Sequence, residues 1–522
     1  MKRTVLILAV LLTVSAVVFA GGGKERTPPG VLSTGTSITV EVFDRGTDGG
    51  RSLAHNNAWT NWIKEKVKRD IGIDVTFVPV GRWSENTDIV NLMASGSAPD
   101  LCYTYGGDMI AAFRDQGGIL NLTPYIDSHL PDLKKLLGAD PAFTGKDFIY
   151  RNADPQTGHI YSIPSYRIAI AQRNVFIRKD WLDKLGLPVP KTIQEFENAL
   201  IAFRDKDPGN VGKNRVVPLA VNEDTRWGLA DFIHHHINNL NDRDRWVYNI
   251  ADRYIMMPGY KEGVRLMNKW YNDKLIYNEF PLMFTADDLY NQMKSGVVGA
   301  FCQNWDLPYR QDYKINEELA ANVPGAEFVA VDLNLKNKDM MDKVGLQIFI
   351  PAYAKNQEGA LKYLNWLAKP ENYGFLQIGR EGVNHRIEDG IPRIISPSAG
   401  DPWFQNSPQN IDYTMPINGV ELGSVEKNGR ALAQSYGNTP ADAVVNAYTI
   451  SLRNARAPAV YQATTTINQY SQDLREKADD LLVQAISAPA ANFNRIWDNG
   501  IREWRTSGAQ AVYDERAKLY RR

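Results

Sequence analysis

The stretch ITVEVF at residues 38–43 is rich in β-branched and aromatic side chains and predicts a β-strand. Two stretches of the same kind follow, DVTFVPV at 74–80 and DLCYTY at 100–105. Residues 56–69 and 85–94 lie between them and have the apolar spacing of helices. Strands that alternate with helices in this way predict a mainly parallel sheet with helices packed on its faces.

The same alternation begins again after residue 174. The predicted elements of this second unit are strands at 175–178 and 216–221, and helices at 181–185, 192–204 and 227–238. Residues 380–440 are rich in Gly, Pro, Asn and Ser, and the chain is mostly helical from residue 440 onward. The sequence therefore predicts two α/β units and a helical C-terminal region.

The composition is that of a folded protein. Of the 522 residues, 43% are apolar and 23% are charged, which excludes a disordered chain and a multi-pass membrane protein. Lys and Arg number 59 and Asp and Glu 60, so the net charge of −1 offers no basic surplus for nucleic acid. The 12 Trp and 24 Tyr are numerous enough to line a binding cleft as well as a core.

The N-terminus has the pattern of a cleaved export signal. Two basic residues precede an uncharged run at 4–19, with small residues three and one positions before a cleavage site after Ala20. This run is shorter than the roughly 20 residues that span a bilayer. Residues 21–35 then resemble a flexible leader, and no cysteine lies near the cleavage site to carry a lipid. We therefore expect residues 1–20 to be removed and the mature chain to be periplasmic.

The sequence contains none of the common catalytic or nucleotide-binding motifs that we sought. GxxxxGK[ST], GxSxG and HExxH are all missing. His234, His235 and His236 are consecutive, so on a helix their side chains point about 100° apart and do not share one metal ion. Asp287 and Asp288 stand at the start of a predicted helix, where carboxylates oppose the helix dipole. We expect no catalytic residue, no metal and no cofactor.

Aromatic residues stand beside polar residues at the predicted carboxyl ends of several strands. Tyr103 and Tyr105 close one strand, Trp305 closes another beside Asn304, and Trp227 follows a third. Ligands of parallel α/β sheets bind beyond these strand ends. A pyranose offers apolar CH faces for stacking and a rim of hydroxyl groups for polar side chains. Any single ring could instead belong to the core, but three such positions favour a sugar-binding cleft.

Seven segments spread over nearly the whole mature chain form an ordered set. In chain order they are SGSAPDLCYTYGGDMIAAFRDQGGILNLTPYID (95–127), GHIYSIPS (158–165), IRKDWLDKLGLPVPKTIQEFENALIAFRDKDP (177–208), MKSGVVGAFCQNW (293–305), IPAYAKNQEGALKYLNWLAKPENYG (350–374), GREGVNHRIEDG (379–390) and RIWDNGIREWRTSGAQAVYDERAKLY (495–520). Together they resemble the larger, oligosaccharide-type branch of the family 1 extracellular solute-binding proteins, the sugar receptors of bacterial ABC importers. Each motif alone is weak, but the ordered set is specific.

The resemblance implies an α/β fold of the two-lobe periplasmic-binding-protein type, with a mainly parallel sheet flanked by helices in each lobe and a helical C-terminal region. The lobes would be joined by crossing segments near 168–178, 346–353 and 385–400, and would close on the ligand. The first lobe would hold residues 36–170 and 350–395, and the second would hold residues 175–345 and 400–522.

The resemblance also implies a binding protein without catalysis. Such a protein captures an oligosaccharide between its lobes and delivers it to the transmembrane permease subunits of an ABC importer, and we expect it to be a monomer. Two alternatives stay open. An oligopeptide receptor would offer strand edges and charged pockets for the peptide termini. A secreted carbohydrate-active enzyme would need two carboxylates about 5 to 9 Å apart.

The ligand contacts implied by the resemblance lie after predicted strands and near the first crossing. They are Asp44, Arg45, Tyr105, Asp108, Gln172, Arg173, Asn222, Arg226, Trp227, Asn304 and Trp305. Whether Arg167, Arg173 and Arg226 select an acidic glycan or form salt bridges stays open from the sequence.

One departure from the family pattern concerns calcium. Members of this branch often carry a loop of the form D-x-N-x-N-G-K-x-D-E, which here corresponds to residues 207–216. Asp207 and Gly212 match, but Gly209 and Val211 supply no side-chain oxygen, and a hard cation needs six to eight oxygens. We therefore expect no calcium in this loop.

The cysteines are Cys102 and Cys302. By the resemblance they belong to different lobes, and a disulfide needs Cα atoms within about 7 Å of each other. A bond across the cleft would also prevent the lobes from moving. We therefore expect two free, buried thiols.

Overall fold

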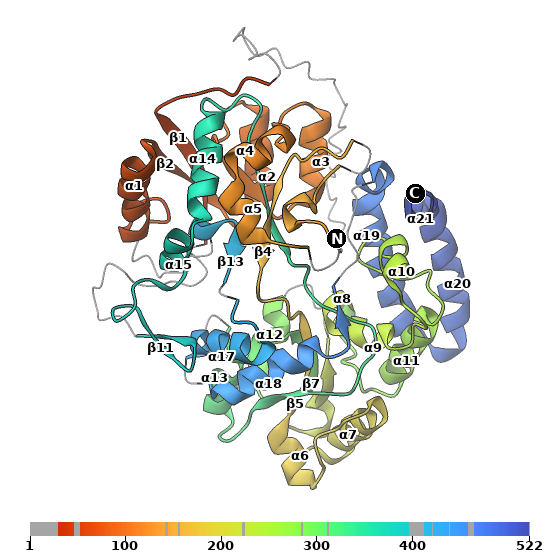
Figure 1. Cartoon of the computed structure of the whole chain (residues 1–522). Helices are drawn as coiled ribbons and strands as arrows, with labels where there is room; N and C mark the ends of the chain where they lie inside the picture. The colour runs from red at the N-terminus through yellow and green to blue at the C-terminus, as the bar shows by residue number, and fades with distance from the viewer. Residues whose placement is uncertain are drawn as a thin grey trace, which may run out of the picture.

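The computed structural model in Figure 1 describes residues 30–45, 53–140, 145–154, 157–221, 225–282, 286–310, 313–395, 412–419, 421–437, 439–457 and 464–520. Within these ranges the side chains of residues 108, 213, 226, 286, 465 and 468 are not described. The predicted signal peptide and residues 21–29 of the leader lie outside the described residues. The chain forms two lobes, with the first above the second in Figure 1.

The first lobe is built on a parallel strand pair and a four-stranded sheet beside it. β1 pairs in parallel with β2 along its whole length, and a parallel bridge joins Val40 of β1 to Leu101, next to β3. The four-stranded sheet has the order β13-β4-β10-β3. In it β10 runs antiparallel to both β4 and β3, and only β13 and β4 are parallel, so this sheet is not mainly parallel as predicted. The strands are β1 (Ser37–Asp44), β2 (Asp74–Gly81), β3 (Cys102–Thr104), β4 (Ile163–Arg167), β10 (Val344–Phe349) and β13 (Ile417–Asn418).

Helices pack around these strands, and α1 shows why they form where they do. The side chain of Asn57 accepts hydrogen bonds from the first backbone N–H groups of α1, and Gly72 ends the helix with a φ of 74°. The buried face of α1 carries Trp59 and Ile63, which lie in one core cluster with Val42 of β1. The helices are α1 (Ala58–Ile71), α2 (Glu85–Ala94), α3 (Gly107–Asp115), α4 (Ile126–His129), α5 (Pro131–Leu137), α14 (Gln357–Leu367) and α15 (Pro370–Ile378).

The second lobe has a four-stranded sheet of order β6-β7-β5-β8. β5 runs antiparallel to both β7 and β8, and only β6 and β7 are parallel. The expectation of a mainly parallel sheet is therefore wrong for this lobe, because β5 enters from the other lobe and runs against its neighbours. The strands are β5 (Arg173–Arg178), β6 (Val217–Ala220), β7 (Val298–Asn304) and β8 (Phe328–Val331).

Two core clusters fill the second lobe, one on each side of β5. Val175 and Ile177 face one cluster, and Phe176 between them faces the other, as the two-residue period of a strand requires. The helices are α6 (Lys179–Leu185), α7 (Ile193–Lys206), α8 (Thr225–Gly228), α9 (Ala230–His234), α10 (Asp242–Val247), α11 (Tyr260–Asn272), α12 (Ala286–Lys294), α13 (Ile315–Asn322), α17 (Val425–Ala433) and α18 (Ala441–Leu452). The short strands β9 (Lys338–Asp339) and β14 (Ala455–Arg456) form a small parallel pair.

The predicted helical C-terminal region is confirmed. Its three long helices stand at the side of the second lobe (Figure 1). The first two pack against α11, and the third packs against α10 and the first. The amide of Asn268 on α11 donates hydrogen bonds to the carbonyl oxygens of Ala485, Ile486 and Ala488, at 3.0, 3.0 and 2.7 Å. The helices are α19 (Thr465–Ser487), α20 (Phe493–Trp504) and α21 (Gln510–Tyr520).

Three chain segments cross between the lobes. One joins β4 to β5, one joins β9 to β10, and one joins β13 to α17. The backbone N–H of Met341 donates to the carbonyl oxygen of Ile170 at 2.8 Å, and the N–H of Ile168 donates to that of Asn418 at 3.1 Å. The crossings are thus hydrogen-bonded to one another.

The crossings and the lobe limits differ from the prediction in detail. The second crossing lies at 340–343, before the predicted 346–353, because β10 pairs with β3 and β4 inside the first sheet. Residues 412–418 were predicted in the second lobe. They belong to the first, since β13 pairs with β4 and since Tyr413 and Met415 lie in the core of that lobe.

The region predicted as a third crossing, 385–400, contains a hairpin. Strands β11 (His385–Glu388) and β12 (Ile391–Ile394) pair antiparallel, and Gln434 beside α17 accepts a hydrogen bond from the N–H of Ile394 at 2.6 Å. Residues 396–400 lie outside the described residues. The described part of this region therefore contacts the second lobe through the hairpin.

Candidate ligand-binding site

Three neighbouring strands of the first lobe end at one edge. β1 ends at Asp44, β2 ends at Gly81, and Tyr105 follows β3. β1 and β2 are parallel, and the bridge between Val40 and Leu101 sets β3 beside β1 in the same direction. The residues directly after these strands therefore lie close together, where α/β sheets bind ligands.

Arg45 follows β1 and is held by a carboxylate of its own chain. Its Nε and Nη2 donate to the two oxygens of Asp412 at 2.6 and 2.8 Å, in a bidentate pair. Asp412 is buried, and this burial raises its pKa to about 6, with the Arg45 guanidinium opposing the shift. Arg45 Nη2 also lies 3.4 Å from the hydroxyl of Tyr105. Arg45 thus positions Tyr105 and has its charge matched within the protein.

Arg82 follows β2 and lies over the ring of Tyr105. Its guanidinium carbon is 4.2 Å from that ring centroid and 5.1 Å from the Trp83 ring. Arg82 is 3.6 Å from Glu85, a separation too long for a hydrogen bond. Its Nε is buried and has no hydrogen-bond partner among the described residues. Arg82 therefore keeps free hydrogen-bonding capacity at this edge.

Trp83 presents the most exposed aromatic ring at this edge, with 80% of its surface accessible. The sequence prediction missed both Trp83 and Arg82. The signal was present, because they follow a predicted strand directly, as Tyr105 does. Residues 74–80 form a predicted strand just as 100–105 do, so the residues after that strand, Arg82 and Trp83, are candidates on the same grounds.

Glu41 lies beneath this edge on β1 and is fully buried. One of its oxygens accepts a hydrogen bond from the backbone N–H of Tyr103 at 3.0 Å. Burial raises the pKa of Glu41 well above its usual value, so the neutral acid is favoured. Glu41 is therefore a poor counter-ion for the arginines above it.

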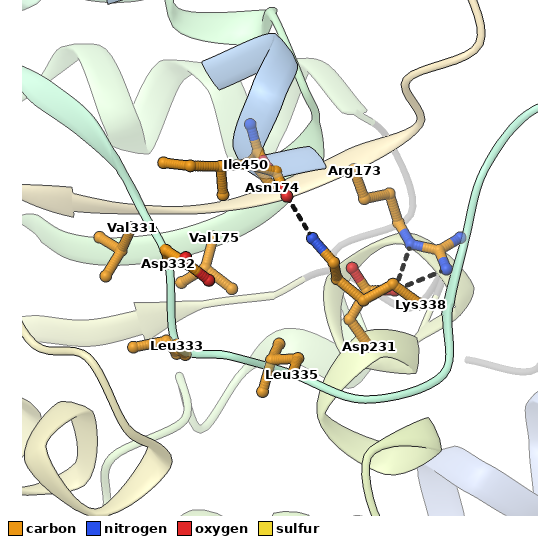
Figure 2. A pocket seen from close by; sticks show the side chains of 10 residues that line it. All are labelled: Arg173, Asn174, Val175, Asp231, Val331, Asp332, Leu333, Leu335, Lys338 and Ile450. Atoms are coloured by element: carbon orange, nitrogen blue, oxygen red, sulfur yellow. Dashed lines mark hydrogen bonds and ion pairs between the residues drawn. The ribbon is translucent and has the colours of Figure 1, made fainter. Parts of the chain in front are cut away.

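Arg173, predicted to contact the ligand, is 3% exposed at the start of β5. Its Nη2 donates to Asp231 at 2.7 Å and to Asp339 at 3.1 Å, and Figure 2 shows the guanidinium directed at Asp231. The adjoining cavity, with Lys338 beside it, has a volume of about 10 Å³, which fits about one water molecule. Arg173 is therefore a buried ion-pair residue, and this cavity is too small for a sugar.

Asp339 is the centre of this buried ion cluster. Besides Arg173 it contacts His234 Nδ1 and Arg245 Nη1, both at 3.2 Å. Burial opposes its charge, but His234, Arg173 and Arg245 together hold the pKa of Asp339 well below its usual value. These three neighbours thus keep this carboxylate ionised.

The other predicted residues of the second lobe lie near the end of β7. Trp305 is only 7% exposed, and its ring packs edge-to-face against Tyr448 at 5.1 Å and Tyr436 at 6.0 Å. The backbone N–H of Trp305 donates to the backbone carbonyl of Gln172 at 3.0 Å. The ring of Trp305 is therefore part of the core and not an open stacking surface.

Asn304 and Trp227 are half-buried, and Gln172 keeps a buried side-chain oxygen that accepts no hydrogen bond from the described residues. Trp227 lies beneath the guanidinium of Arg173, 5.6 Å from its ring centroid. The backbones of Asp108 and Arg226 lie in α3 and α8, but their side chains are not described. The predicted Asn222 lies outside the described residues. Asp44 is exposed at the end of β1.

Both cysteines are free and buried, as predicted. Cys102 lies on β3 in the first lobe and Cys302 on β7 in the second, and burial raises the pKa of both thiols. In the described part of the chain, no group of three or more His, Cys, Asp or Glu side chains is placed to hold a metal ion. His234 is buried against Asp339, and His235 accepts the N–H of Lys336 at 3.1 Å.

Comparison with known proteins identifies the family. The family model of the bacterial extracellular solute-binding proteins matches residues 54–374. The fructooligosaccharide ABC transporter substrate-binding protein FusA of Streptococcus pneumoniae is 25% identical over 295 residues, or 52% of this chain and 52% of FusA. The polygalacturonan/rhamnogalacturonan-binding protein YtcQ of Bacillus subtilis is 21% identical over 466 residues, or 86% of this chain and 85% of YtcQ. The chain thus spans about half the length of FusA and most of YtcQ.

Solved structures share the fold over most of their length. The alginate-binding protein AlgQ2 superimposes with a TM-score of 0.62 at 19% identity, covering 93% of this chain and 98% of AlgQ2. An extracellular solute-binding protein from Bifidobacterium longum subsp. infantis gives 0.61 at 18% identity, covering 93% of this chain and 97% of its own.

Across the described residues, no helix combines the length and hydropathy needed to cross a bilayer. The family model covers more than half of the sequence, and the two-lobe fold agrees with it. The chain belongs to the bacterial extracellular solute-binding protein family.

Proposed function

We propose that this protein captures an oligosaccharide between its two lobes and delivers it to the permease subunits of an ABC importer. The observation that carries the proposal is the ring of Trp83, which is 80% exposed directly after a parallel strand and lies beside Arg82 and Tyr105. A flat ring open to solvent stacks on the apolar face of a pyranose, and guanidinium donors bind its hydroxyl groups.

The names of two relatives support a carbohydrate ligand. FusA is described as binding fructooligosaccharides, and YtcQ as binding polygalacturonan and rhamnogalacturonan. The rival ligand is a peptide, which would need an exposed strand edge and charged pockets for its termini. The exposed ring favours the sugar.

In this proposal each lobe supplies part of the site. The first lobe holds residues 36–167, 344–395 and 412–418, and the second holds residues 173–339 and 425–522. The first lobe contributes Asp44, Trp83, Tyr105 and Asp108, and the second contributes Asn222, Arg226, Trp227 and Asn304. Gln172 lies in the crossing between β4 and β5. Arg45, Arg173 and Trp305 support these residues from within the protein.

The remaining parts of the proposal concern the protein as it works in the cell. It acts as a monomer without catalysis, cofactor or bound metal, in the periplasm, after removal of residues 1–20. A secreted carbohydrate-active enzyme is the alternative, and release of new reducing ends from a bound glycan over hours would identify it.

Isothermal titration calorimetry against panels of oligosaccharides and peptides tests the proposal. We expect an oligosaccharide to bind, and Trp83→Ala to weaken that binding by about tenfold to a hundredfold, or roughly 1 to 3 kcal/mol. Trp83→Phe keeps an aromatic face and should retain most of the affinity. The melting temperature should not change, because the Trp83 ring is already exposed.

Tyr520→Ala is the matched control, since Tyr520 is also exposed but lies at the end of α21. It should bind as the unmodified protein does. Binding of peptides without binding of any glycan would overturn the proposal. So would a Trp83→Ala variant that binds its glycan with full affinity, because the stacking surface would then lie elsewhere.

A further inference from the structure

Arg167 ends β4, and no described residue forms an ion pair with its guanidinium. Its side chain is half-buried, and it makes no hydrogen bond or ion pair to any described residue. Its backbone N–H donates to the carbonyl of Lys343 at 2.6 Å. Burial, together with the like charge of Arg82, lowers the pKa of Arg167, although a guanidinium stays charged at any physiological pH. Arg167 therefore carries a partly desolvated positive charge.

The two other arginines at this edge differ in how far they are neutralised. Arg45 is fully paired, in the bidentate contact with buried Asp412. Arg82 is only loosely paired, 3.6 Å from Glu85, and its buried Nε has no partner among the described residues. Arg82 and Arg167 therefore both offer unused N–H donors.

Arg82 and Arg167 both act on Tyr105. Arg82 lies over the Tyr105 ring, and Arg167 is near enough to interact electrostatically with Tyr105, with Asp342 and with Arg82. Two like charges that are partly removed from water repel each other. A partly buried charge without an ion-pair partner also destabilises the fold. The protein keeps this arrangement beside Trp83, the most exposed tryptophan among the described residues.

The carboxylates around these arginines are already engaged. Asp342 pairs with Arg151 at 3.0 Å, Asp412 pairs with Arg45, and Asp44 is not free either. Glu41 is held toward its neutral form by burial. The charge of Asp342 acts on Arg167 from a distance but is shared with Arg151, and no described carboxylate forms an ion pair with Arg167. A bound ligand could therefore supply the direct counter-ion.

A carboxylate suits this place better than a hydroxyl group does. The planar fork of a guanidinium matches the two oxygens of a carboxylate, and such charge-assisted pairs are about twice as strong as neutral hydrogen bonds. A sugar hydroxyl would satisfy a donor but would leave the charge unmatched.

We infer that the ligand is an acidic oligosaccharide built from uronic acids, and that Arg167, assisted by Arg82, binds one of its ring carboxylates. The inference rests on the proposed function and names its substrate class. Trp83 would stack on a neighbouring sugar ring, and Tyr105 would hold the two guanidinium groups in place.

The test compares trigalacturonate with the same trisaccharide in which every carboxyl group is methyl-esterified. The two keep the same ring hydroxyls and linkages and differ in charge. A second pair, a mannuronate trisaccharide and its methyl ester, covers a different uronic acid. We expect one of the acids to bind at least about tenfold more tightly than its ester by calorimetry, and this preference to shrink as NaCl rises.

Arg167→Gln should reduce the preference for the acid over the ester to less than about threefold, because it removes the charge and keeps a polar side chain. Arg167→Lys keeps the charge but loses the fork, and should retain part of the preference. Arg69→Gln is the matched control, because Arg69 is exposed in the last turn of α1. This variant should keep the full preference for the acid. Melting temperatures establish that each variant is folded.

The possible failures separate the two proposals. Equal or tighter binding of the esters, or tight binding of neutral or sulfated oligosaccharides alone, would overturn the acidic ligand and leave the proposed function standing. An acid preference that survives Arg167→Gln would overturn the assignment to Arg167. If no glycan binds, charged or neutral, the proposed function itself fails.

Discussion

Two tryptophans near strand ends have opposite surroundings. Trp83 is 80% exposed, whereas Trp305 is 7% exposed between Tyr436 and Tyr448. The Trp83 ring makes few contacts within the protein and leaves a face open to a ligand. The Trp305 ring fills part of the core, and its removal would leave a cavity there.

Trp305→Ala should therefore destabilise the fold. Removing a buried tryptophan side chain costs about 3 to 5 kcal/mol, because the cavity collapses only in part. Urea unfolding followed by far-UV circular dichroism measures the change. An unchanged unfolding midpoint combined with lost glycan binding would instead place this ring in the ligand site.

At the residue scale, the sequence predicts which positions follow strands but not which of them stay open. Tyr105 and Trp305 fit the same local pattern. Trp305 is covered by Tyr436 and Tyr448, which lie more than a hundred positions further along the chain. No local sequence pattern reveals that contact. Arg173 was misjudged for the same reason, since its partners Asp231 and Asp339 are distant in sequence.

The loop after α7 shows how an element can close without a cation. Asp207 ends the helix with a φ of 45°, and its two carboxylate oxygens accept the N–H groups of Val211 and Gly212 at 3.0 and 2.8 Å. The ammonium of Lys184 donates to the carbonyl of Pro208 at 3.1 Å. The oxygens that would face a cation are thus hydrogen-bonded within the protein.

EDTA should leave the melting temperature of this protein unchanged, and millimolar calcium should not raise it, because a bound ion would stabilise by mass action. Asp207→Ala should lower stability by about 0.5 to 1.5 kcal/mol, because the N–H groups of Val211 and Gly212 lose their acceptor. Differential scanning fluorimetry measures both. A melting temperature that drops by several degrees in EDTA and recovers with calcium alone would contradict this reading of the loop.

Element positions were largely predictable, whereas strand direction was not. The predicted helix at 85–94 coincides with α2, because its apolar spacing and flanking serines are local signals. The predicted helix at 227–238 is instead divided into α8 and α9. Gly228, at the end of α8, lies so close to Val221 that a Cβ there would be 2.7 Å from its side chain. Packing of this kind, like the antiparallel direction of β5, depends on distant partners.

The whole molecule depends on how the crossings are attached to the second lobe. Arg173 begins β5 directly after the first crossing, and Asp339 ends β9 directly before the second. Their ion pair, reinforced by Arg245 and His234, joins the two crossings at this end. The buried cluster thus fixes the second lobe to both connecting segments.

This attachment should weaken in acid. The pKa of Asp339 is held below its usual value of about 4 in the folded protein, so the unfolded chain binds the proton first. The stabilisation is present above about pH 4 and is lost as the pH falls below it. Asp339→Asn should cost about 3 to 5 kcal/mol at pH 7 and should lose less further stability between pH 5 and pH 3.

Urea midpoints at several pH values, compared with an Asp183→Asn control on the exposed face of α6, measure this difference. Parallel pH curves for Asp339→Asn and the unmodified protein would show that other carboxylates govern the acid response.

The two-lobe plan was predictable because the ordered motifs run along nearly the whole chain. The assignment of residues 412–418 to the first lobe was not. β13 has only two residues, Ile417 and Asn418, too few to show any periodicity, and it is recognised only by its pairing with β4.

The place of β13 also sets the order in which the molecule can be completed. Its partner β4 ends at Arg167, and β10, which lies on the other side of β4, ends at Phe349. At about 5 to 20 residues per second, roughly 10 to 50 s pass between the synthesis of β4 and that of its edge strand. Wherever the chain folds, the edge of β4 is open to pairing with other chains until β13 is in place. Such late-closing topologies fold slowly and leave time for a chaperone or an export machine to hold the chain unfolded.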